Sequence, residues 1–320
     1  MKIKISIIIS AYNEEKSILN LSKSLLSVLS KLNDYHFEVI FVNDGSTDQT
    51  SIRINEFAQN YKAPNVSYVK IEFSKNFGHE AAMISGIDNA TGDATICMDA
   101  DGQHPPEEIP DMITAFLEGN DFVLMSRIQR NGNGFLKKVL SELFYKIINS
   151  LSNIPFQENA SDFFLISDPI ASILRENYRA KNRFIRGFIQ SLGFKNRTIC
   201  FISPDREHGK SNYSYKKLFK LVVSAIFTFS FKPLRLSVFF AIVFILLTII
   251  LGIFSLYQYI YGDTPPSGYT TIILFISLSF TLLFSIISIQ LLYFEKLIEE
   301  IRQSPIYIIK SKHIYGKTDK

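Results

Sequence analysis

The first part of the chain alternates short apolar runs with amphipathic stretches. Residues 3–10, which read IKISIIIS, are mostly β-branched and apolar, as expected of a central parallel strand with both faces covered. In residues 18–29 the apolar side chains recur at helical spacing, and a second apolar run begins at Phe37. Strand, helix and strand together make one βαβ unit.

The same alternation continues to about residue 126. The pattern predicts further strands and helices, with strands at residues 66–73, 94–100 and 121–126 and helices at about 80–89 and 106–118. Repeated βα units predict an α/β fold in which helices cover both faces of a mostly parallel sheet. In such sheets ligands bind beyond the carboxyl ends of the strands. The polar residues that follow each predicted strand are therefore the first candidates for a site.

The pattern is less regular between residues 135 and 201. KKVLSELFYKIINSL, at residues 137–151, predicts a helix, and KNRTICFI, at residues 195–202, predicts a short strand. We predict no domain boundary between residues 135 and 201.

Earlier in the chain, Asn13 is predicted to cap the helix that follows the first strand.

Two long uncharged stretches follow. No charged residue occurs between Leu236 and Gly262, and after Asp263 none occurs until Glu295. A hydrocarbon layer of about 30 Å takes about 20 helical residues to cross, so the stretches predict two transmembrane helices at about residues 236–259 and 270–294. The alternative is a pair of buried helices in a soluble domain, which would need a core large enough to surround both.

Positive charges lie only on the outer flanks of these two stretches. The connection YIYGDTPPSGY has no Lys or Arg, whereas the flanks carry Lys216, Lys217, Lys220, Lys232, Arg235, Lys296, Arg302, Lys310 and Lys312. The positive-inside rule therefore places both ends of the chain in the cytoplasm. The predicted organisation is a cytoplasmic domain at residues 1–213, an interfacial helix at 214–233, two spans within 234–294 and a cytoplasmic tail at 295–320.

Composition excludes several classes of protein. The chain has 320 residues and a formal net charge of +4, without the concentrated Lys and Arg of a nucleic-acid-binding arm. Its two cysteines fit a reducing compartment better than a disulfide framework. The first apolar run is too short, and too soon followed by YNEE, for a signal peptide. We therefore expect a reduced, membrane-bound protein that does not bind nucleic acid.

The segment MDADGQHPP gathers acidic and amide side chains directly after a predicted strand. Asp99, Asp101 and Gln103 alternate with small residues, and the following His-Pro-Pro prevents a simple continuation of the strand. Two carboxylates and an amide oxygen are hard ligands for Mg²⁺ or Mn²⁺, and such ions also bind substrate phosphates. A nucleoside diphosphate is thus the expected partner. The alternative is that the two aspartates only cap the helix that starts near Pro106.

Two other polar segments fit the same chemistry. Asp44, at the end of the second strand, can accept hydrogen bonds from a base or a ribose, although an Asx turn is the plain alternative. Far downstream, Arg206, Lys210 and Ser211 surround a glycine in a composition suited to phosphate oxygens. For the following Lys216 and Lys217 we expect only attraction to anionic lipid.

Several of these segments together resemble a known family. SAYNEE, VNDGSTDQT, FSKNFGHEAAMISGIDNATGD, MDADGQHPPEEIP, SDFFLIS and REHGKSNY, followed by FKPLRL and two apolar stretches, are similar to the polyprenyl-phosphate glycosyltransferases of glycosyltransferase family 2. The resemblance covers nearly the whole chain. It implies a GT-A fold for residues 1–213, a UDP- or GDP-linked sugar donor and a divalent metal. It also implies inverting transfer of one sugar to undecaprenyl or dolichyl phosphate at the cytoplasmic or inner membrane, for cell-envelope or O-antigen glycan modification.

The resemblance also implies roles for individual residues. Tyr12, Glu14 and Asp44 would contact the nucleoside, Asp99 the ribose, donor or metal, and Asp101 with Gln103 the metal. Phosphates would be met by Arg127, Arg206, Lys210 and Ser211. Asp162 corresponds to an active-site aspartate of the family, and Asp99, Asp101, Asp162 and Arg206 would form the catalytic set. His79 and His104 are expected to have no catalytic role.

The chain departs from the family pattern at several positions. Phe164 stands where family members often have an arginine, and Asn43 replaces a frequent aspartate. Neither departure removes a predicted metal ligand. A phosphomonoester acceptor has a second pKa near about 6, so it is largely dianionic at neutral pH and needs no strong general base. Asp162 is therefore expected to orient the acceptor or an arginine.

Two other functions remain to be weighed. A processive polysaccharide synthase would share the N-terminal fold, but such enzymes usually carry more spans and a tryptophan-containing acceptor motif, and this chain has no tryptophan. A non-catalytic nucleotide-binding membrane scaffold would not need Asp99, Asp101 and Gln103. The sequence leaves open the sugar, the base of the nucleotide and whether the protein forms a homo-oligomer.

Overall fold

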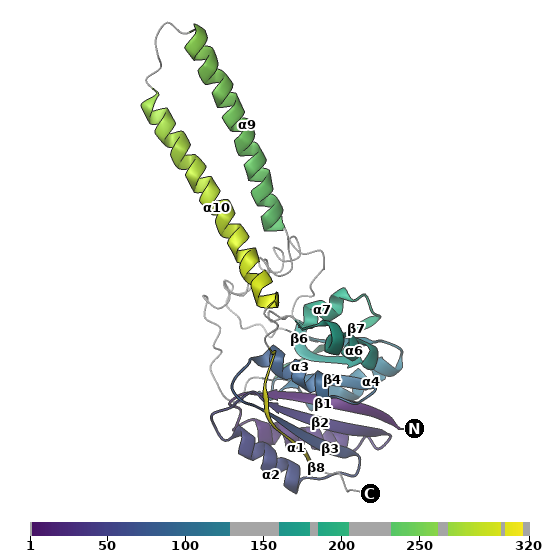
Figure 1. Cartoon of the computed structure of the whole chain (residues 1–320). Coiled ribbons are helices and arrows are strands. Elements are labelled where there is room, and N and C mark those ends of the chain that lie inside the picture. Colours follow the sequence, from purple (N-terminus) through teal and green to yellow (C-terminus); the bar gives the residue numbers. More distant parts are fainter. Residues whose placement is uncertain are drawn as a thin grey trace. The chain divides into compact units, whose positions relative to one another are not determined.

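The structure, a computed structural model, describes residues 2–128, 160–179, 185–204, 232–261, 268–301 and 305–315 (Figure 1). The chain divides into two compact units. The first contains the sheet and comprises Met1–Tyr145, Ile154–Asn212 and Pro305–Lys320, and the second comprises Lys146–Asn153 and Tyr213–Ser304. The helix predicted at residues 137–151, and all but the last two residues of the one predicted at 214–233, lie outside the described residues.

The first part of the sheet unit follows the predicted βα alternation. In chain order its elements are β1 (Ile3–Ala11), α1 (Ile18–Leu29), β2 (Tyr35–Asn43), α2 (Thr50–Asn60), β3 (Val66–Phe73), α3 (His79–Asn89), β4 (Ala94–Asp99), the short η1 (Pro106–Glu108), α4 (Ile109–Leu117) and β5 (Phe122–Arg127). β1 pairs in parallel with β2 and β4, and β2 pairs in parallel with β3. The strands and helices predicted here are confirmed, with small shifts at their ends.

The rest of the sheet contains an antiparallel strand that the sequence did not predict. β6 (Ala160–Ser167), α6 (Asp168–Asn177), α7 (Ile185–Ser191) and β7 (Asn196–Phe201) follow in chain order, and the sheet order is β7-β5-β6-β4-β1-β2-β3-β8. β6 runs antiparallel to both β4 and β5, whereas β7 is parallel to β5. The start of β6 therefore lies at the sheet edge where its neighbours end.

The strand β8 (Ile309–Tyr315) lies within the predicted tail at residues 295–320, where the sequence predicted no strand. It pairs antiparallel with β3 at the end of the sheet. The Tyr315 hydroxyl donates to Asn55 at 2.8 Å. Just before β8, the Tyr307 hydroxyl donates to Asp88 at 2.6 Å, and its ring stacks on Phe73 with centroids 5.2 Å apart. These contacts fix the C-terminal segment on the sheet unit.

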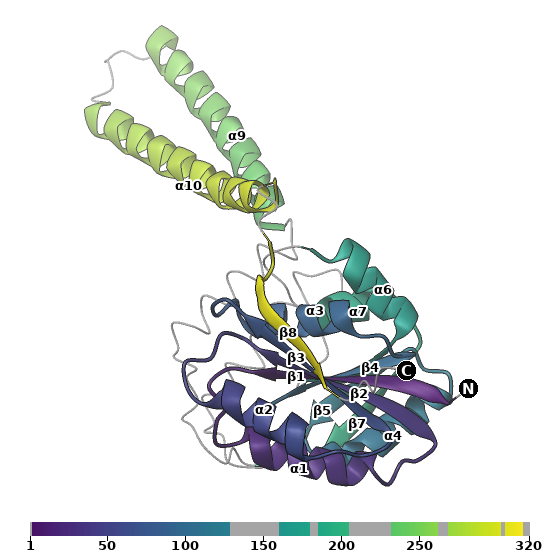
Figure 2. The same cartoon turned by 60° about the horizontal axis from the view of Figure 1, so that its bottom comes forward.

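The core consists of one apolar layer on each face of the sheet. Ile5, Ile7 and Ile9 of β1 face the layer formed with α1, α2 and α4, whereas Ile8 faces the layer formed with α3, α6 and α7. Figure 2 shows the two sets of helices on opposite faces. Gly86 lets α3 pack closely on β1, because a Cβ there would lie 2.3 Å from Ile8 Cγ2. The predicted α/β architecture with covered faces is thus confirmed.

The second unit contains two long helices, α9 (Lys232–Tyr261) and α10 (Tyr269–Ile301). Phe244 and Phe275 stack across them with ring centroids 5.7 Å apart. Among the described residues, one stretch, Leu278–Glu295 of α10, is long and apolar enough to cross a membrane, and none of it is buried within the chain. Its exposure argues against a buried core helix. The apolar stretch of α9, Val238–Phe254, is shorter.

Candidate active site

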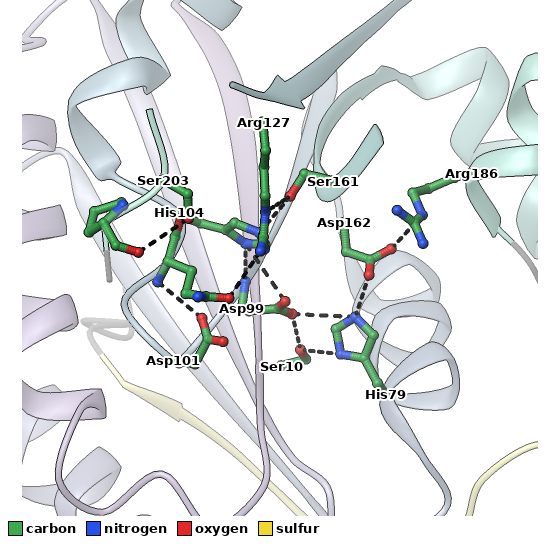
Figure 3. Close-up of polar contacts among 12 residues, drawn as sticks. Ser10, His79, Asp99, Asp101, His104, Arg127, Ser161, Asp162, Arg186 and Ser203 are labelled. Carbon is green, nitrogen blue, oxygen red and sulfur yellow. Dashed lines mark hydrogen bonds and ion pairs between the residues drawn. The ribbon is translucent and has the colours of Figure 1, made fainter. Parts of the chain in front are cut away.

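The candidate site lies at the edge of the sheet where the parallel strands end. β1, β2, β4 and β5 end there, and the antiparallel β6 begins there. The first residue of α3, His79, enters the same region. Figure 3 shows polar side chains from these elements converging: Ser10, His79, Asp99, Asp101, His104, Arg127, Ser161 and Asp162.

Asp99 is tied to β1 and to α3. Its Oδ1 accepts a hydrogen bond from the Ser10 hydroxyl at 3.1 Å and lies 3.3 Å from Nε2 of His79. Burial raises the pKa of Asp99 to about 6, although the positive charge of His79 opposes that rise. Because Oδ1 is engaged in this way, a bond from Asp99 to an ion would have to use Oδ2.

Asp162, the third residue of β6, is paired with two cationic groups. Its Oδ1 lies 2.9 Å from Nε of Arg186 on α7, and its Oδ2 lies 3.6 Å from Nε2 of His79. Burial alone would raise the pKa of Asp162, but Arg186 and His79 hold it well below its usual range. Asp162 is therefore an anion at neutral pH and a poor proton acceptor.

His79, expected from the sequence to be incidental, bridges the two aspartates. The Ser10 hydroxyl gives its one hydrogen to Asp99, so the 2.9 Å contact between Ser10 Oγ and His79 Nδ1 requires that Nδ1 donate. Nε2 meanwhile faces the two carboxylates. Burial would lower the pKa of His79, but Asp99 and Asp162 raise it to about 10. The ring is thus an imidazolium with both nitrogens protonated.

His79, Asp99 and Asp162 also lie close enough together to be compared with a metal site. Each of the three residues offers one ligand atom, and these three atoms lie within 4.8 Å of one another, a spacing that could hold a metal ion. In the imidazolium form neither ring nitrogen has a lone pair for an ion, so an ion could bind here only after Nε2 had lost its proton. We therefore interpret the three residues as an ion-pair cluster that fixes the ends of β4 and β6 relative to α3.

The loop after β4 presents Gln103 next to Arg127. The Gln103 N–H donates to Oδ1 of Asp101 at 3.0 Å, and its backbone carbonyl accepts from the Ser203 hydroxyl at 3.0 Å. The side-chain oxygen Oε1 of Gln103 accepts from Nη1 of Arg127 at 3.0 Å. The structure therefore brings together Asp101, Gln103 and Arg127, which the sequence placed in one predicted site.

His104, also expected to be incidental, is fully buried beneath this loop. Its Nδ1 accepts a hydrogen bond from the Asp99 backbone N–H at 2.8 Å, and its Nε2 lies 2.7 Å from the Ser161 hydroxyl. The ring stacks on Phe163 of β6, with centroids 5.1 Å apart. His104 thus fixes the turn that carries Asp99 and Asp101, and its role in the described structure is to hold other site residues in place.

Asp44 makes backbone contacts that the sequence did not predict. Its two oxygens accept hydrogen bonds from the N–H groups of Phe77 and Gly78 at 2.7 and 2.9 Å. Gly45, with φ of 64°, allows this approach, because a Cβ there would lie 2.3 Å from the carbonyl carbon of Lys75. Burial raises the pKa of Asp44, and the two N–H groups oppose that rise. Asp44 therefore positions the turn before α3, and its contact with a nucleoside stays a prediction.

Tyr12 and Glu14 lie in the turn after β1. The Tyr12 side chain is exposed, and a Glu14 carboxylate oxygen accepts from the Ser17 hydroxyl at 2.5 Å. The predicted cap is wrong: α1 begins only at Ile18, and Asn13, with φ of 56°, instead accepts from the Thr47 N–H at 2.9 Å. The nucleoside contacts of Tyr12 and Glu14 stay predictions. The phosphate contacts predicted for Arg206, Lys210 and Ser211 also stay predictions, because these residues lie outside the described residues.

A divalent ion fits the donor set of the loop after β4. Asp101 and Gln103 share one short turn, and their carboxylate and amide oxygens are the ligand types that Mg²⁺ and Mn²⁺ prefer. Asp99 could add Oδ2. Gln103 Oε1 is held by Arg127 in the structure, so an ion could use that oxygen only after the guanidinium had moved away.

Comparisons with known proteins bear on this site. Residues 6–173 match the family model described as glycosyl transferase family 2. The SfII prophage-derived bactoprenol glucosyl transferase of Shigella flexneri is 31% identical over 97% of this chain and 98% of its own length. The prophage bactoprenol glucosyl transferase homolog of Escherichia coli (strain K12) is 33% identical over 96% and 98%.

Solved structures offer a more distant likeness. The mannosyltransferase PcManGT from Pyrobaculum calidifontis in complex with GDP-Man and Mn²⁺ is 14% identical over 73% of this chain and 65% of that one, with a TM-score of 0.49. This likeness is too weak to assign a donor or an ion to the present chain.

Proposed function

This chain belongs to glycosyl transferase family 2 and is a glycosyltransferase with a GT-A-like fold, and from that premise we propose that it transfers one sugar from a nucleoside-diphosphate sugar to a polyprenyl phosphate, with inversion. The observation that carries the proposal is the meeting of Asp101, Gln103 and Arg127 at the carboxyl edge of the sheet. This arrangement sets a guanidinium on the amide oxygen of Gln103, two residues from the carboxylate of Asp101. A diphosphate with a divalent counterion needs both kinds of group.

The acceptor is proposed from the extent of the likeness. Two proteins named bactoprenol glucosyl transferase or a homolog of it match this chain over nearly the full length of each partner. The matched length includes α9 and α10, which lie beyond the family model. A lipid phosphate would explain why the helices accompany the catalytic fold, since the acceptor itself resides in a membrane.

The residues of the site would act mainly by binding and orientation. The acceptor phosphate is largely dianionic at neutral pH, so no strong base is required. This agrees with Asp162, which Arg186 and His79 hold as an anion and which would orient the acceptor or a phosphate-binding arginine. Arg127 would bind the leaving diphosphate. An ion held by Asp101 and Gln103, with Asp99, would supply neutralisation of the diphosphate charge.

The other predicted residues complete the proposal. Tyr12, Glu14 and Asp44 would bind the nucleoside of a UDP- or GDP-linked donor. Arg206, Lys210 and Ser211 would bind phosphates near the membrane. We further propose that α9 and α10 both cross the membrane, that an interfacial helix precedes α9, and that the catalytic domain and both termini lie in the cytoplasm.

The proposed function can be tested with membranes that contain the full chain. The membranes are incubated with labelled UDP- and GDP-sugars and with undecaprenyl or dolichyl phosphate. The expected product is chloroform-soluble, labile to mild acid and carries one sugar per lipid by mass spectrometry. Membranes with the Asp101→Asn variant serve as the control. A ladder of sugars on one carrier would favour a processive synthase, and no turnover with any donor would favour a non-catalytic protein.

A further inference from the structure

Gln103 is held at three points, and only one of them involves its side chain. Its N–H is bonded to Asp101 and its carbonyl to Ser203, both at 3.0 Å, so its backbone position is fixed from two sides. The side-chain oxygen is bonded to Arg127 at 3.0 Å. Rotation of the side chain can therefore change the partner of Oε1 without moving the loop.

The contact with Arg127 conflicts with metal binding. An ion bonded to the amide oxygen would lie about 2.1 Å from it. A guanidinium nitrogen 3.0 Å from the same oxygen would then bring a second positive charge into direct contact with the ion. A cation–cation contact of this kind is unfavourable, so the ion and Arg127 cannot share Oε1 closely.

Arg127 is incompletely satisfied in its present position. His104 Nδ1 accepts from the Asp99 N–H, so that nitrogen carries no proton and the neutral ring carries its hydrogen on Nε2. Nη2 of Arg127 lies 3.0 Å from this Nε2. Both groups are hydrogen-bond donors, so this contact is not a hydrogen bond. Arg127 therefore has a donor available for an anion that enters the site.

The geometry points to an exchange in which Arg127 and the divalent ion alternate on Oε1 of Gln103. When no nucleotide sugar is bound, Arg127 donates a hydrogen bond to Gln103 Oε1. When a diphosphate enters, the Arg127 side chain turns to the diphosphate and the Gln103 side chain turns to the ion. The inference rests on the proposed function, because it assumes the ion site at Asp101 and Gln103. It assigns Arg127 a second role, as a positioning residue that makes ion binding depend on the diphosphate.

The exchange would also act at the end of the reaction. Departure of the nucleoside diphosphate leaves the Arg127 guanidinium without its anion. In the structure its Nη1 donates to Gln103 Oε1 at 3.0 Å, and its Nε donates to the Ser161 hydroxyl at 3.3 Å. Its return would remove one ligand from the ion. Ion and product would therefore leave together, so the ion would not remain bound alone among the carboxylates.

The test measures the affinity of Mn²⁺ alone for the purified full chain in detergent, by titration calorimetry and by the electron paramagnetic resonance signal of free Mn²⁺. Arg127→Met should bind Mn²⁺ about tenfold more tightly than wild type, a coupling within the range for residues of one network. In the otherwise wild-type chain, Gln103→Leu should change the affinity for Mn²⁺ by less than about twofold. In the Arg127→Met background, the same change should remove the tenfold gain in Mn²⁺ affinity.

A matched control separates this exchange from general electrostatics. Arg186→Met also removes one guanidinium from the cluster, but Arg186 pairs with Asp162. If Arg186→Met tightens Mn²⁺ binding as much as Arg127→Met does, or if the gain does not depend on Gln103, the exchange is wrong. Arg127→Gln replaces Arg127→Met if the latter does not give a cooperative melting transition.

Two further measurements distinguish failure of this inference from failure of the proposed ion site. In the presence of UDP or GDP, Gln103→Leu should weaken Mn²⁺ binding to the otherwise wild-type chain; an equal effect with and without either nucleotide would overturn the exchange. Asp101→Asn should abolish Mn²⁺ binding in the Arg127→Met background. If Mn²⁺ still binds there, the ion lies elsewhere and the proposed site fails.

Discussion

His79 and Asp99 form an ion pair in which Nε2 lies 3.3 Å from Oδ1, although the two residues come from α3 and β4. The pair links α3, on one face of the sheet, to β4, the strand that leads into the loop carrying Asp101 and Gln103. Its strength depends on the charge of the imidazole, and this makes the stability of the site dependent on pH.

We predict that the contribution of His79 to stability is lost at alkaline pH. Burial opposes protonation, but Asp99, Asp162 and Glu80 raise the pKa of His79 from 6.5 to about 10. A raised pKa means that the stabilisation is complete below pH 6.5 and is lost as the pH rises through about 10. The melting temperature of His79→Gln should therefore be well below that of wild type at pH 7, and the difference should disappear near pH 10.5.

The measurement is thermal unfolding of the detergent-solubilised chain between pH 7 and 10.5. This range stays above the pKa of Asp99, about 6, so Asp99 remains charged throughout. His36→Gln, which changes an exposed histidine on β2, is the control and should follow wild type. A difference between His79→Gln and wild type that does not vary with pH would contradict the assigned charge.

We predict that activity depends on a divalent ion bound through Asp101. Asp101→Asn should reduce turnover by about a thousandfold or more, because an ion supplies several kcal/mol of charge stabilisation to a departing diphosphate. Turnover is measured with Mg²⁺, with Mn²⁺ and with excess chelator. Asp111→Asn, an exposed change on α4, is the matched control. Near-normal turnover in Asp101→Asn, or full activity in chelator, would remove the metal assignment.

We predict that Tyr307 stabilises the sheet unit through Asp88. Tyr307→Phe keeps the ring that stacks on Phe73 but loses the 2.6 Å hydrogen bond. A hydrogen bond to a charged group contributes about 1.5–3 kcal/mol, so the melting temperature should fall by roughly 3–10 °C. In an Asp88→Ala background the same change should have little further effect. An equal fall in both backgrounds would place the loss outside this bond.

We predict that the connection between α9 and α10 is outside the cytoplasm and that β8 is inside. Single cysteines are placed by Ser267→Cys and His313→Cys in a chain carrying Cys97→Ala and Cys200→Ser. His313 suits the test because it is exposed, whereas Ser311 donates to Glu72 within the sheet. An impermeant maleimide should label only the first variant in intact cells. Labelling of the second would overturn the topology.

The sequence allowed the parallel part of the fold to be predicted for a clear physical reason. β1, β2 and β4 are covered on both faces, so their residues form continuous apolar runs. β8 escaped notice because IKSKHIY lies at the sheet end with most side chains exposed and carries three basic residues. β6 is apolar, but nothing in SDFFLIS reveals that it runs antiparallel.

The candidate site was only partly visible in the sequence. Asp99, Asp101 and Gln103 follow a predicted strand, and this position indicated their convergence, whereas Arg127 and Asp162 were candidates only through the family resemblance. The two histidines were missed because their roles depend on tertiary contacts. His79 had one readable signal, its place at the start of a helix after a strand, which directs it toward the strand ends. His104 had no such signal in the sequence, because its burial against Phe163 depends on the position of β6.

The position of β8 has a consequence for how the protein is made. The sheet unit is discontinuous, since β3 lies early in the chain and its neighbour β8 follows both long helices. A ribosome that has released β1 to β7 has therefore not yet supplied the last strand of the sheet. The pairing of β3 with β8 can therefore form only after α9 and α10 have been synthesised, so the sheet reaches its final extent late in the making of the chain.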